Sequence, residues 1–149
     1  MKTSEVILTI LFFTLSLYAQ KSETEWEPVF TEGADKVYVD VSGLKSFHSD
    51  DIYVWTLTVH STPIVIESVK DKIYKTNTYY LFNSKLNKYS MLHIIYYDKN
   101  GNVLASYDYG RNTNVQAYQY NYPVLKGSPE YAILQKCLDV IKSKDDSSN

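Results

Sequence analysis

Residues 94–107 of the chain read IIYYDKNGNVLASY. Two runs of β-branched and aromatic residues, which favour strands, flank the polar turn sequence Asp98–Asn102. Within that turn, Asn100 and Gly101 tolerate the positive φ angles that a tight connection between antiparallel strands requires. The stretch therefore predicts a β-hairpin, and with it an antiparallel sheet.

Oxygen-bearing side chains alternate through the same turn, at Asp98, Asn100 and Asn102. This spacing also occurs at the start of a calcium-binding loop. A complete loop would follow a helix and would place a glutamate at its last position, where this chain has Tyr109. We therefore expect a plain turn, with no metal site and no cofactor.

Several further segments carry strand patterns. In the segment Tyr53–His60, one side is formed by Tyr53, Trp55, Leu57 and Val59, and the other by Thr56, Thr58 and His60. This alternation predicts a half-buried strand. The other predicted strands are Trp26–Phe30, Lys36–Val41, Thr78–Phe82 and Tyr89–Tyr97. Because Pro28 has no N–H to donate to a neighbouring strand, the first of them is expected at an edge of the sheet.

One helix is expected near the end of the chain. Ser128 can cap its start, Pro129 suits its first turn, and Glu130 lies where the helix dipole favours an anion. An apolar stripe at helical spacing follows, formed by Ile133, Leu134, Cys137, Leu138, Val140 and Ile141. We expect this helix to lie across one face of the sheet, with Cys137 in its buried stripe.

The first residues have the pattern of an export signal. Lys2 precedes the apolar run Val6–Leu17, which is too short to span a bilayer comfortably, and Ala19 supplies a small residue for cleavage. We predict that residues 1–19 are removed; an uncleaved membrane anchor is the alternative. Because no cysteine lies near Ala19, no lipid anchor is expected, and the mature protein is predicted to be periplasmic or secreted, without a transmembrane segment.

A single domain is predicted for residues 26–142, which carry all the strand and helix patterns. The flanking segments 20–25 and 143–149 are polar, and we expect them to be a flexible lead and a disordered tail. The formal net charge is −2, so the chain lacks the strong positive field typical of nucleic-acid binding. Nucleic acid is therefore not expected as a partner.

The sequence lacks the common catalytic motifs. His48, His60 and His93 are scattered without the spacing of a metal site, and no nucleophile elbow, phosphate-binding loop or dinucleotide fingerprint occurs. Distant residues can still assemble into a triad in a folded chain. In the absence of any positive sign of catalysis, we predict a non-enzymatic protein.

Tyrosine is frequent, with fifteen residues in the chain, and several flank the polar loop 110–114. A tyrosine ring offers rigid contact area together with a hydroxyl, a combination common in recognition surfaces. The predicted contact residues are Tyr109, Arg111, Tyr118 and Tyr120, and Arg111 could pair with an acidic partner. The alternative, which the residues leave open, is that these tyrosines only cover the sheet. Structural roles are expected for Trp26, Trp55, Leu134 and Leu138.

The order of several short motifs resembles the surface-adhesin protein E family. The motifs are Trp26 with Val29, Tyr38-Val39-Asp40 followed by Gly43-Leu44, Val54-Trp55, Tyr97–Val103, Ser128-Pro129 and Cys137. They extend over nearly all of the mature chain. The resemblance implies an α+β fold, in which an antiparallel sheet of about six strands is backed by one C-terminal helix. It also implies adhesion at the bacterial surface to host extracellular-matrix components.

Two departures from the family pattern concern cysteine. Relatives commonly pair a cysteine of the central strand region with the C-terminal one, and the position we align with the former holds Ser84. We therefore expect no disulfide, and a buried, unpaired Cys137 unless it links two chains of a homodimer. Relatives can also be anchored by a lipid, for which this chain offers no cysteine at its predicted cleavage site.

Together these patterns predict an exported binding module that contacts a macromolecule, such as a host or matrix protein, outside the cell. The alternative is a periplasmic carrier of a small ligand, or an enzyme of unknown chemistry. A deep pocket lined by Trp55 and His93 would favour the alternative, whereas a flat exposed tyrosine face would favour adhesion.

Overall fold

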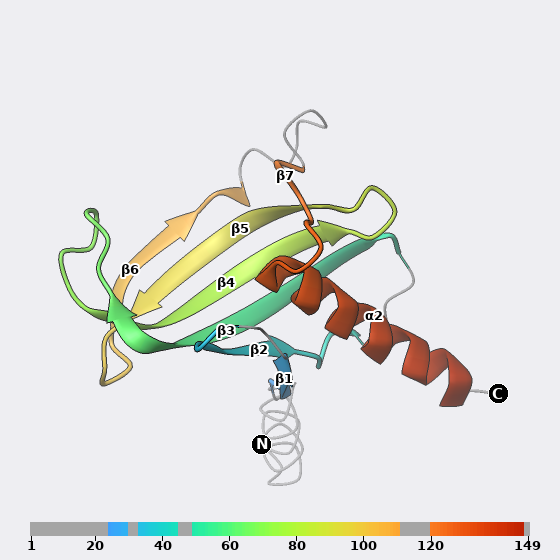
Figure 1. Ribbon diagram of the computed structural model, residues 1–149, viewed down its shortest axis with the longest axis horizontal. Helices are drawn as coiled ribbons and strands as arrows, with labels where there is room; N and C mark the ends of the chain where they lie inside the picture. Colours follow the sequence, from blue (N-terminus) through green and yellow to red (C-terminus); the bar gives the residue numbers. More distant parts are fainter. Residues whose placement is uncertain (1–23, 30–32, 45–48, 111–119, 148–149) are drawn as a thin grey trace, which may run out of the picture.

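The structure is a computed structural model that describes residues 24–29, 33–44, 49–110 and 120–147. It is an α+β fold, in which consecutive antiparallel strands form a sheet in the order β1-β2-β3-β4-β5-β6 and one C-terminal helix, α2, packs on it (Figure 1). The expected fold class is thereby confirmed. The strands are β1 (Trp26–Val29), β2 (Lys36–Asp40), β3 (Asp51–Ile64), β4 (Ile73–Asn83), β5 (Lys88–Tyr97), β6 (Val103–Asp108) and β7 (Tyr122–Pro123), and the helix is α2 (Pro129–Ser147).

The predicted hairpin joins β5 to β6. Gly101 has a φ of 86°, a conformation that glycine adopts without steric cost. The Asp98 carboxylate accepts hydrogen bonds from the backbone N–H groups of Asn100 and Asn102, each at 2.8 Å, and from the Asn102 side chain at 2.7 Å. These bonds, above all the one from the Asn102 side chain, lower the pKa of Asp98. The Asp98 carboxylate thus holds the turn through the N–H groups of Asn100 and Asn102.

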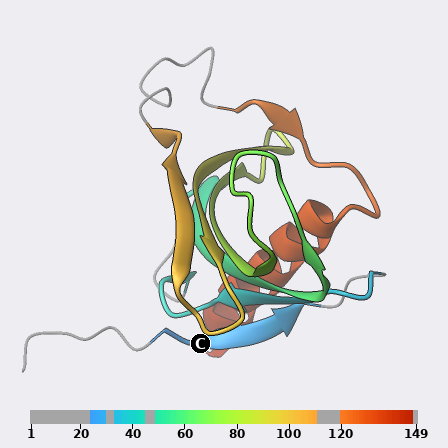
Figure 2. The same cartoon turned by 90° about the vertical axis from the view of Figure 1, so that its left-hand side faces the viewer.

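The two sides of the sheet differ in burial. On β3, the side that carries Ile52, Val54 and Thr56 is buried, and we call it the helix face because it packs on α2. The opposite side carries Tyr53 and Trp55, and we call it the open face. The sheet is curved, and α2 lies on its concave side (Figure 2). β1 lies at the edge of the sheet, as Pro28 predicted.

Helix α2 begins as its sequence predicts. The backbone N–H of Tyr131 donates to Ser128 Oγ at 3.2 Å, and Gly127, with a φ of 86°, directly precedes the cap. Ile133, Leu134 and Cys137 of the stripe are buried in the core. The thiol of Cys137 is free, and burial raises its pKa to about 12.

The end of α2 differs from the expectation of a disordered tail from residue 143. The helix continues to Ser147, and the Ser143 hydroxyl donates to the carbonyl of Val140 at 2.9 Å. After Pro129 the sequence holds no glycine or proline that would end a helix, so the polar residues extend it.

The predicted signal peptide, 1–19, and the lead as far as residue 23 lie outside the described residues. Glu25, expected in the lead, is tied to β2, since its N–H donates to Asp40 Oδ1 at 3.1 Å and its carbonyl accepts from Val41 at 2.8 Å. Within the described ranges, no helix has the length and apolar character needed to cross a membrane.

Candidate binding site

Aromatic rings from three neighbouring strands meet on the open face. Trp55 of β3 stacks on Tyr79 of β4, with ring centroids 4.8 Å apart and planes at 23°. Tyr53 lies 6.2 Å from Tyr79, and His93 of β5 lies 5.7 Å from Trp55. Because Trp55 is the register partner of Tyr79, and Tyr79 that of His93, pairing of the strands brings the rings together. We call Tyr53, Trp55, Tyr79 and His93 the aromatic row.

The aromatic row is accessible from solvent. Tyr53 is 44% exposed, and its three companions are half-buried. The only helix among the described residues, α2, packs on the other face. Burial, followed by the influence of Tyr53, raises the pKa of Tyr79, so its hydroxyl stays protonated at neutral pH. The row therefore offers apolar ring area with hydroxyl groups, the composition of a recognition surface.

Polar groups border the row. His93 Nε2 lies 2.7 Å from Ser106 Oγ, and Asp108 is the register partner of His93 on β6. On β4, Asn77 Oδ1 is buried and has no hydrogen-bond partner among the described residues. Native proteins rarely leave a buried polar atom unsatisfied.

Tyr120 closes one end of the open face. Its hydroxyl donates to Asp51 Oδ1 at 2.5 Å, and Asn83 Nδ2 donates to the same oxygen at 2.6 Å. Asp51 and Asn83 are register partners at the ends of β3 and β4. Burial, and then the hydrogen bond to Asp51, raises the pKa of Tyr120. Tyr120 therefore links the segment before β7 to the ends of β3 and β4, the two central strands of the sheet.

The structure does not show the other predicted contact residues at the end of the open face where Tyr120 lies. Tyr109 is 50% exposed and stacks on Tyr107, with centroids 6.4 Å apart, and Tyr107 in turn meets Tyr96 at 6.1 Å. Strand register places Tyr107 opposite Ile94, on the helix face. Tyr109 and Tyr120 thus belong to different sides of the sheet. Arg111 and Tyr118 lie outside the described residues.

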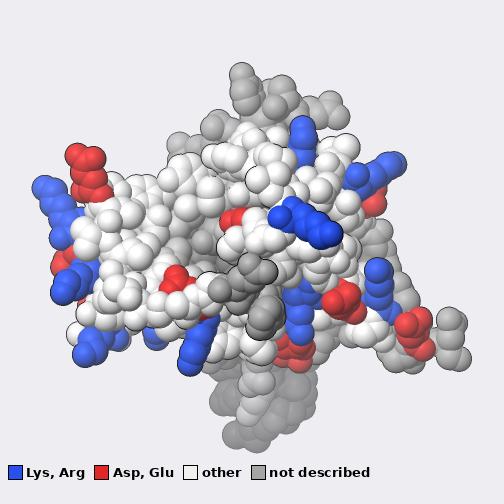
Figure 3. Space-filling model, in the orientation of Figure 1, with Lys and Arg blue, Asp and Glu red and all other residues white. Residues whose placement is uncertain are grey.

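A pocket of about 610 Å³ opens on the helix face, beside the first turn of α2 (Figure 3). Its walls come from the start of β2, from β3 and β4, and from the start of α2. They comprise Gly33, Ala34, Asp35, Val37, Thr58, Tyr80 and residues 127–133. A deep pocket lined by Trp55 and His93 would have favoured a carrier or an enzyme. These two residues do not line this pocket and lie on the open face.

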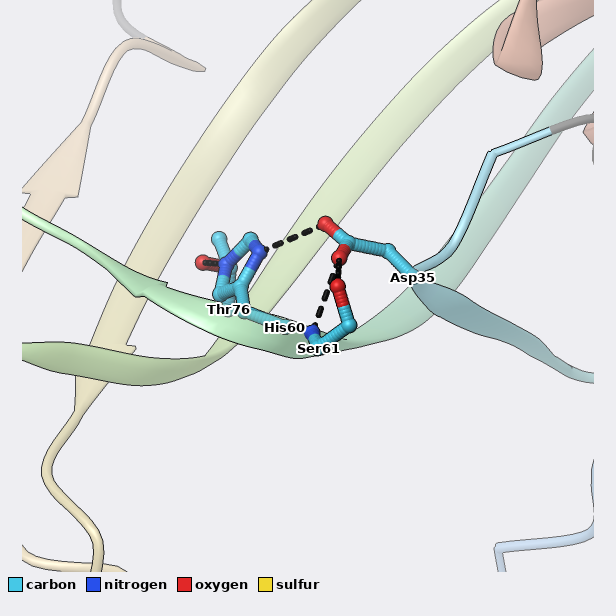
Figure 4. A network of polar contacts seen from close by, with 4 residues as sticks. All are labelled: Asp35, His60, Ser61 and Thr76. Atoms are coloured by element: carbon cyan, nitrogen blue, oxygen red, sulfur yellow. Dashed lines mark hydrogen bonds and ion pairs between the residues drawn. The ribbon is translucent and has the colours of Figure 1, made fainter.

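A chain of hydrogen bonds runs beside this pocket (Figure 4). Asp35 Oδ2 lies 2.9 Å from His60 Nδ1, and His60 Nε2 lies 2.8 Å from Thr76 Oγ1. Asp35 Oδ1 accepts from the Ser61 N–H at 2.9 Å and from its hydroxyl at 3.0 Å. A neutral His60 that donates through Nδ1 to the carboxylate would accept from the threonine hydroxyl through Nε2. The pKa of Asp35 is lowered, chiefly by the Ser61 backbone N–H.

These bonds fasten the start of β2 to the last third of β3. The order carboxylate, imidazole, hydroxyl is also that of a catalytic triad. Acyl transfer would further require donors aimed at the oxyanion of a bound substrate. Among the described residues, the observed contacts establish the anchoring role of these hydrogen bonds.

Comparison with known protein families matches residues 26–137 to the family described as surface-adhesin protein E. Comparisons with curated proteins and with solved structures give no significant match. The matched segment starts with β1 and ends in α2, so it covers the whole sheet and the buried helix residues Ile133, Leu134 and Cys137. The chain belongs to the surface-adhesin protein E family.

Proposed function

We propose that the protein is an exported, non-enzymatic binding module, and that its aromatic row contacts a macromolecular partner outside the cell. Family membership supports an adhesin-like binding role. The observation that carries the proposal is the position of the row, on a face that α2 does not cover. An accessible apolar surface of this kind is typical of a site that meets another molecule.

The row suits contact with a large partner better than enclosure of a small one. Tyrosine and tryptophan dominate the binding energy of many protein interfaces, because a rigid ring gains area at little entropic cost. His93, Ser106 and Asp108 supply polar groups at the border of the row. Tyr109, Arg111, Tyr118 and Tyr120 remain predicted contact residues.

The test compares two equally exposed tyrosines on opposite sides. Tyr53 belongs to the row and is 44% exposed, while Tyr122 is 45% exposed and packs against Tyr89. The chain without residues 1–19 is presented to a panel of purified extracellular-matrix proteins on a biosensor surface. We expect Tyr53→Ser to weaken binding and Tyr122→Ser to leave it intact. Equal effects of the two substitutions on binding would show that the row is not part of the contact surface.

A surface role also requires exposure on the cell. Fractionation and protease shaving of intact cells should release or cleave the protein, whereas a purely periplasmic location would contradict adhesion to a host.

The hydrogen-bonded chain Asp35–His60–Thr76 favours the alternative of an enzyme. Its test is a screen of small ester substrates with the wild type and with Thr76→Val. Turnover by the wild type that the substitution abolishes would establish the alternative and replace the binding module.

A further inference from the structure

We propose that the pocket on the helix face receives a lysine or arginine side chain of a partner protein. This site lies on the opposite side of the sheet from the aromatic row, and the inference does not depend on that row.

The size and walls of the pocket suit a long side chain with an apolar stem. Its volume of about 610 Å³ falls within the range of sites that enclose small ligands or side chains. Apolar wall comes from Ala34, Val37 and Ile133, and ring surface from Tyr80 and Tyr131. Methylene groups would lie against this lining, as they do when lysine and arginine stems are buried.

The charge of the lining selects a cation. Two carboxylates, those of Asp35 and Glu130, belong to the lining, and its described residues include no lysine, arginine or histidine. The start of α2 contributes the equivalent of about half a positive charge. Two negative charges exceed this contribution, so the pocket is net negative when His60, which lies 2.9 Å from Asp35, is neutral.

The two carboxylates differ in how they are held. Hydrogen bonds from His60 and Ser61 fix Asp35 in place. Glu130 is half-buried, and no cation among the described residues pairs with it. Two carboxylates in one lining, one of them fixed and the other without an ion-pair partner among the described residues, suit a guanidinium or ammonium group, which donates several hydrogen bonds at once.

The tyrosines complete the site for a cation. Tyr80 is 8% exposed and lines the pocket, and burial together with the charge of Glu130 raises its pKa. Its hydroxyl therefore stays protonated. A cation near the ring of Tyr80 or Tyr131 would also be attracted by the negative face of the ring.

The experiment uses short blocked peptides as probes, with the ¹⁵N-labelled chain lacking residues 1–19. Peptides of one arginine or one lysine between glycines should shift the amide signals of residues 127–133, and a citrulline peptide of the same shape should not. We expect Glu130→Gln to weaken binding by about fivefold, the upper end of the loss expected from one solvent-accessible charge pair. Asp139→Asn, on the exposed side of the same helix, should have no effect.

A blocking variant gives a second reading that leaves both carboxylates in place. Ala34→Phe should fill the mouth of the pocket and abolish the shifts. Equal binding of the citrulline peptide, or an unchanged affinity of Glu130→Gln, would overturn the proposal. Tighter binding of free putrescine than of either peptide would also overturn it, because the site would then select a small amine.

Discussion

The ring of Trp55 lies stacked on the ring of Tyr79, with centroids 4.8 Å apart, on the side of the sheet opposite α2. The two residues are register partners on adjacent strands, so the backbone ladder holds the rings together. A surface ordered in this way loses little side-chain entropy when a partner binds. The proposed binding role of the row would use this property.

The stack itself should be measurable as a coupling between the two rings. Trp55→Leu and Tyr79→Leu, alone and together, form a double-mutant cycle in urea denaturation. We expect a coupling free energy of about 1 kcal/mol, typical of aromatic pairs beyond their burial. Tyr79→Phe, which keeps the ring, is the control and should preserve the coupling. Simple additivity of the two leucine variants would contradict the stack.

The row shows which parts of the molecule the sequence could predict. The β5–β6 hairpin and α2 depend on local signals, Asn100-Gly101 and Ser128-Pro129, and both are confirmed. The row instead depends on register. Tyr79 and Tyr80 are adjacent and identical. Only the pairing of the strands decides that the Tyr79 ring joins the aromatic row and the Tyr80 ring packs in the core.

Two longer-range features likewise could not be predicted from the local sequence. A register shift between β4 and β5 sets His93 opposite Tyr79 and Met91 opposite Tyr80, which leaves Leu92 without a partner on β4. The contact of Asp35 with His60 joins residues 25 positions apart, and it follows from the β2–β3 register, in which Lys36 pairs with Val59. A tertiary arrangement of this kind is fixed by the whole fold.

Removing the hydroxyl of Tyr120 should destabilise the protein. Tyr120→Phe deletes the bond to Asp51 and leaves that carboxylate with the Asn83 side chain as its remaining side-chain donor. We expect the free energy of unfolding to fall by about 1 kcal/mol. Tyr109→Phe, at a 50% exposed tyrosine, should leave it unchanged. An unaltered melting temperature of Tyr120→Phe would mean that the bond contributes nothing net.

Replacing Asn77 should stabilise the protein. Its buried Oδ1 has no hydrogen-bond partner among the described residues, and desolvation of such an atom is costly. Asn77→Val removes that atom and adds a side chain that favours strands, so we expect a gain of about 1 kcal/mol in thermal or urea unfolding. A matched substitution, Asn102→Val, removes a donor to Asp98 and should destabilise instead. Loss of stability in Asn77→Val would show that water or an undescribed residue satisfies the amide.

The stability of the protein should depend on pH through Asp35. Hydrogen bonds, chiefly from the Ser61 backbone N–H, lower its pKa in the folded state below the ordinary value of 3.8. A lowered pKa contributes stability above the unfolded value, and this contribution is lost as the pH falls through the folded value. The difference in unfolding free energy between the wild type and Asp35→Asn should therefore shrink below about pH 4. A difference that stays constant from pH 7 to pH 2 would contradict this linkage.

Cys137 should be slow to react in the folded protein. It is fully buried, and burial raises its thiol pKa to about 12, so little thiolate forms at pH 8. A thiol reagent should label it slowly in buffer and rapidly in urea. Because the folded pKa exceeds the ordinary thiol value of 9.0, its contribution to stability is complete below pH 9 and is lost between about pH 9 and 12.

Two substitutions at Cys137 separate packing from chemistry. Cys137→Ala removes one buried atom, whereas Cys137→Ser keeps the size but buries a hydroxyl, so the serine variant should be the less stable unless its hydroxyl finds an acceptor within the helix. Non-reducing electrophoresis then tests the family relationship. A monomer agrees with a core thiol whose expected partner position holds Ser84. A covalent dimer that a reductant converts to monomers would require Cys137 to leave the core.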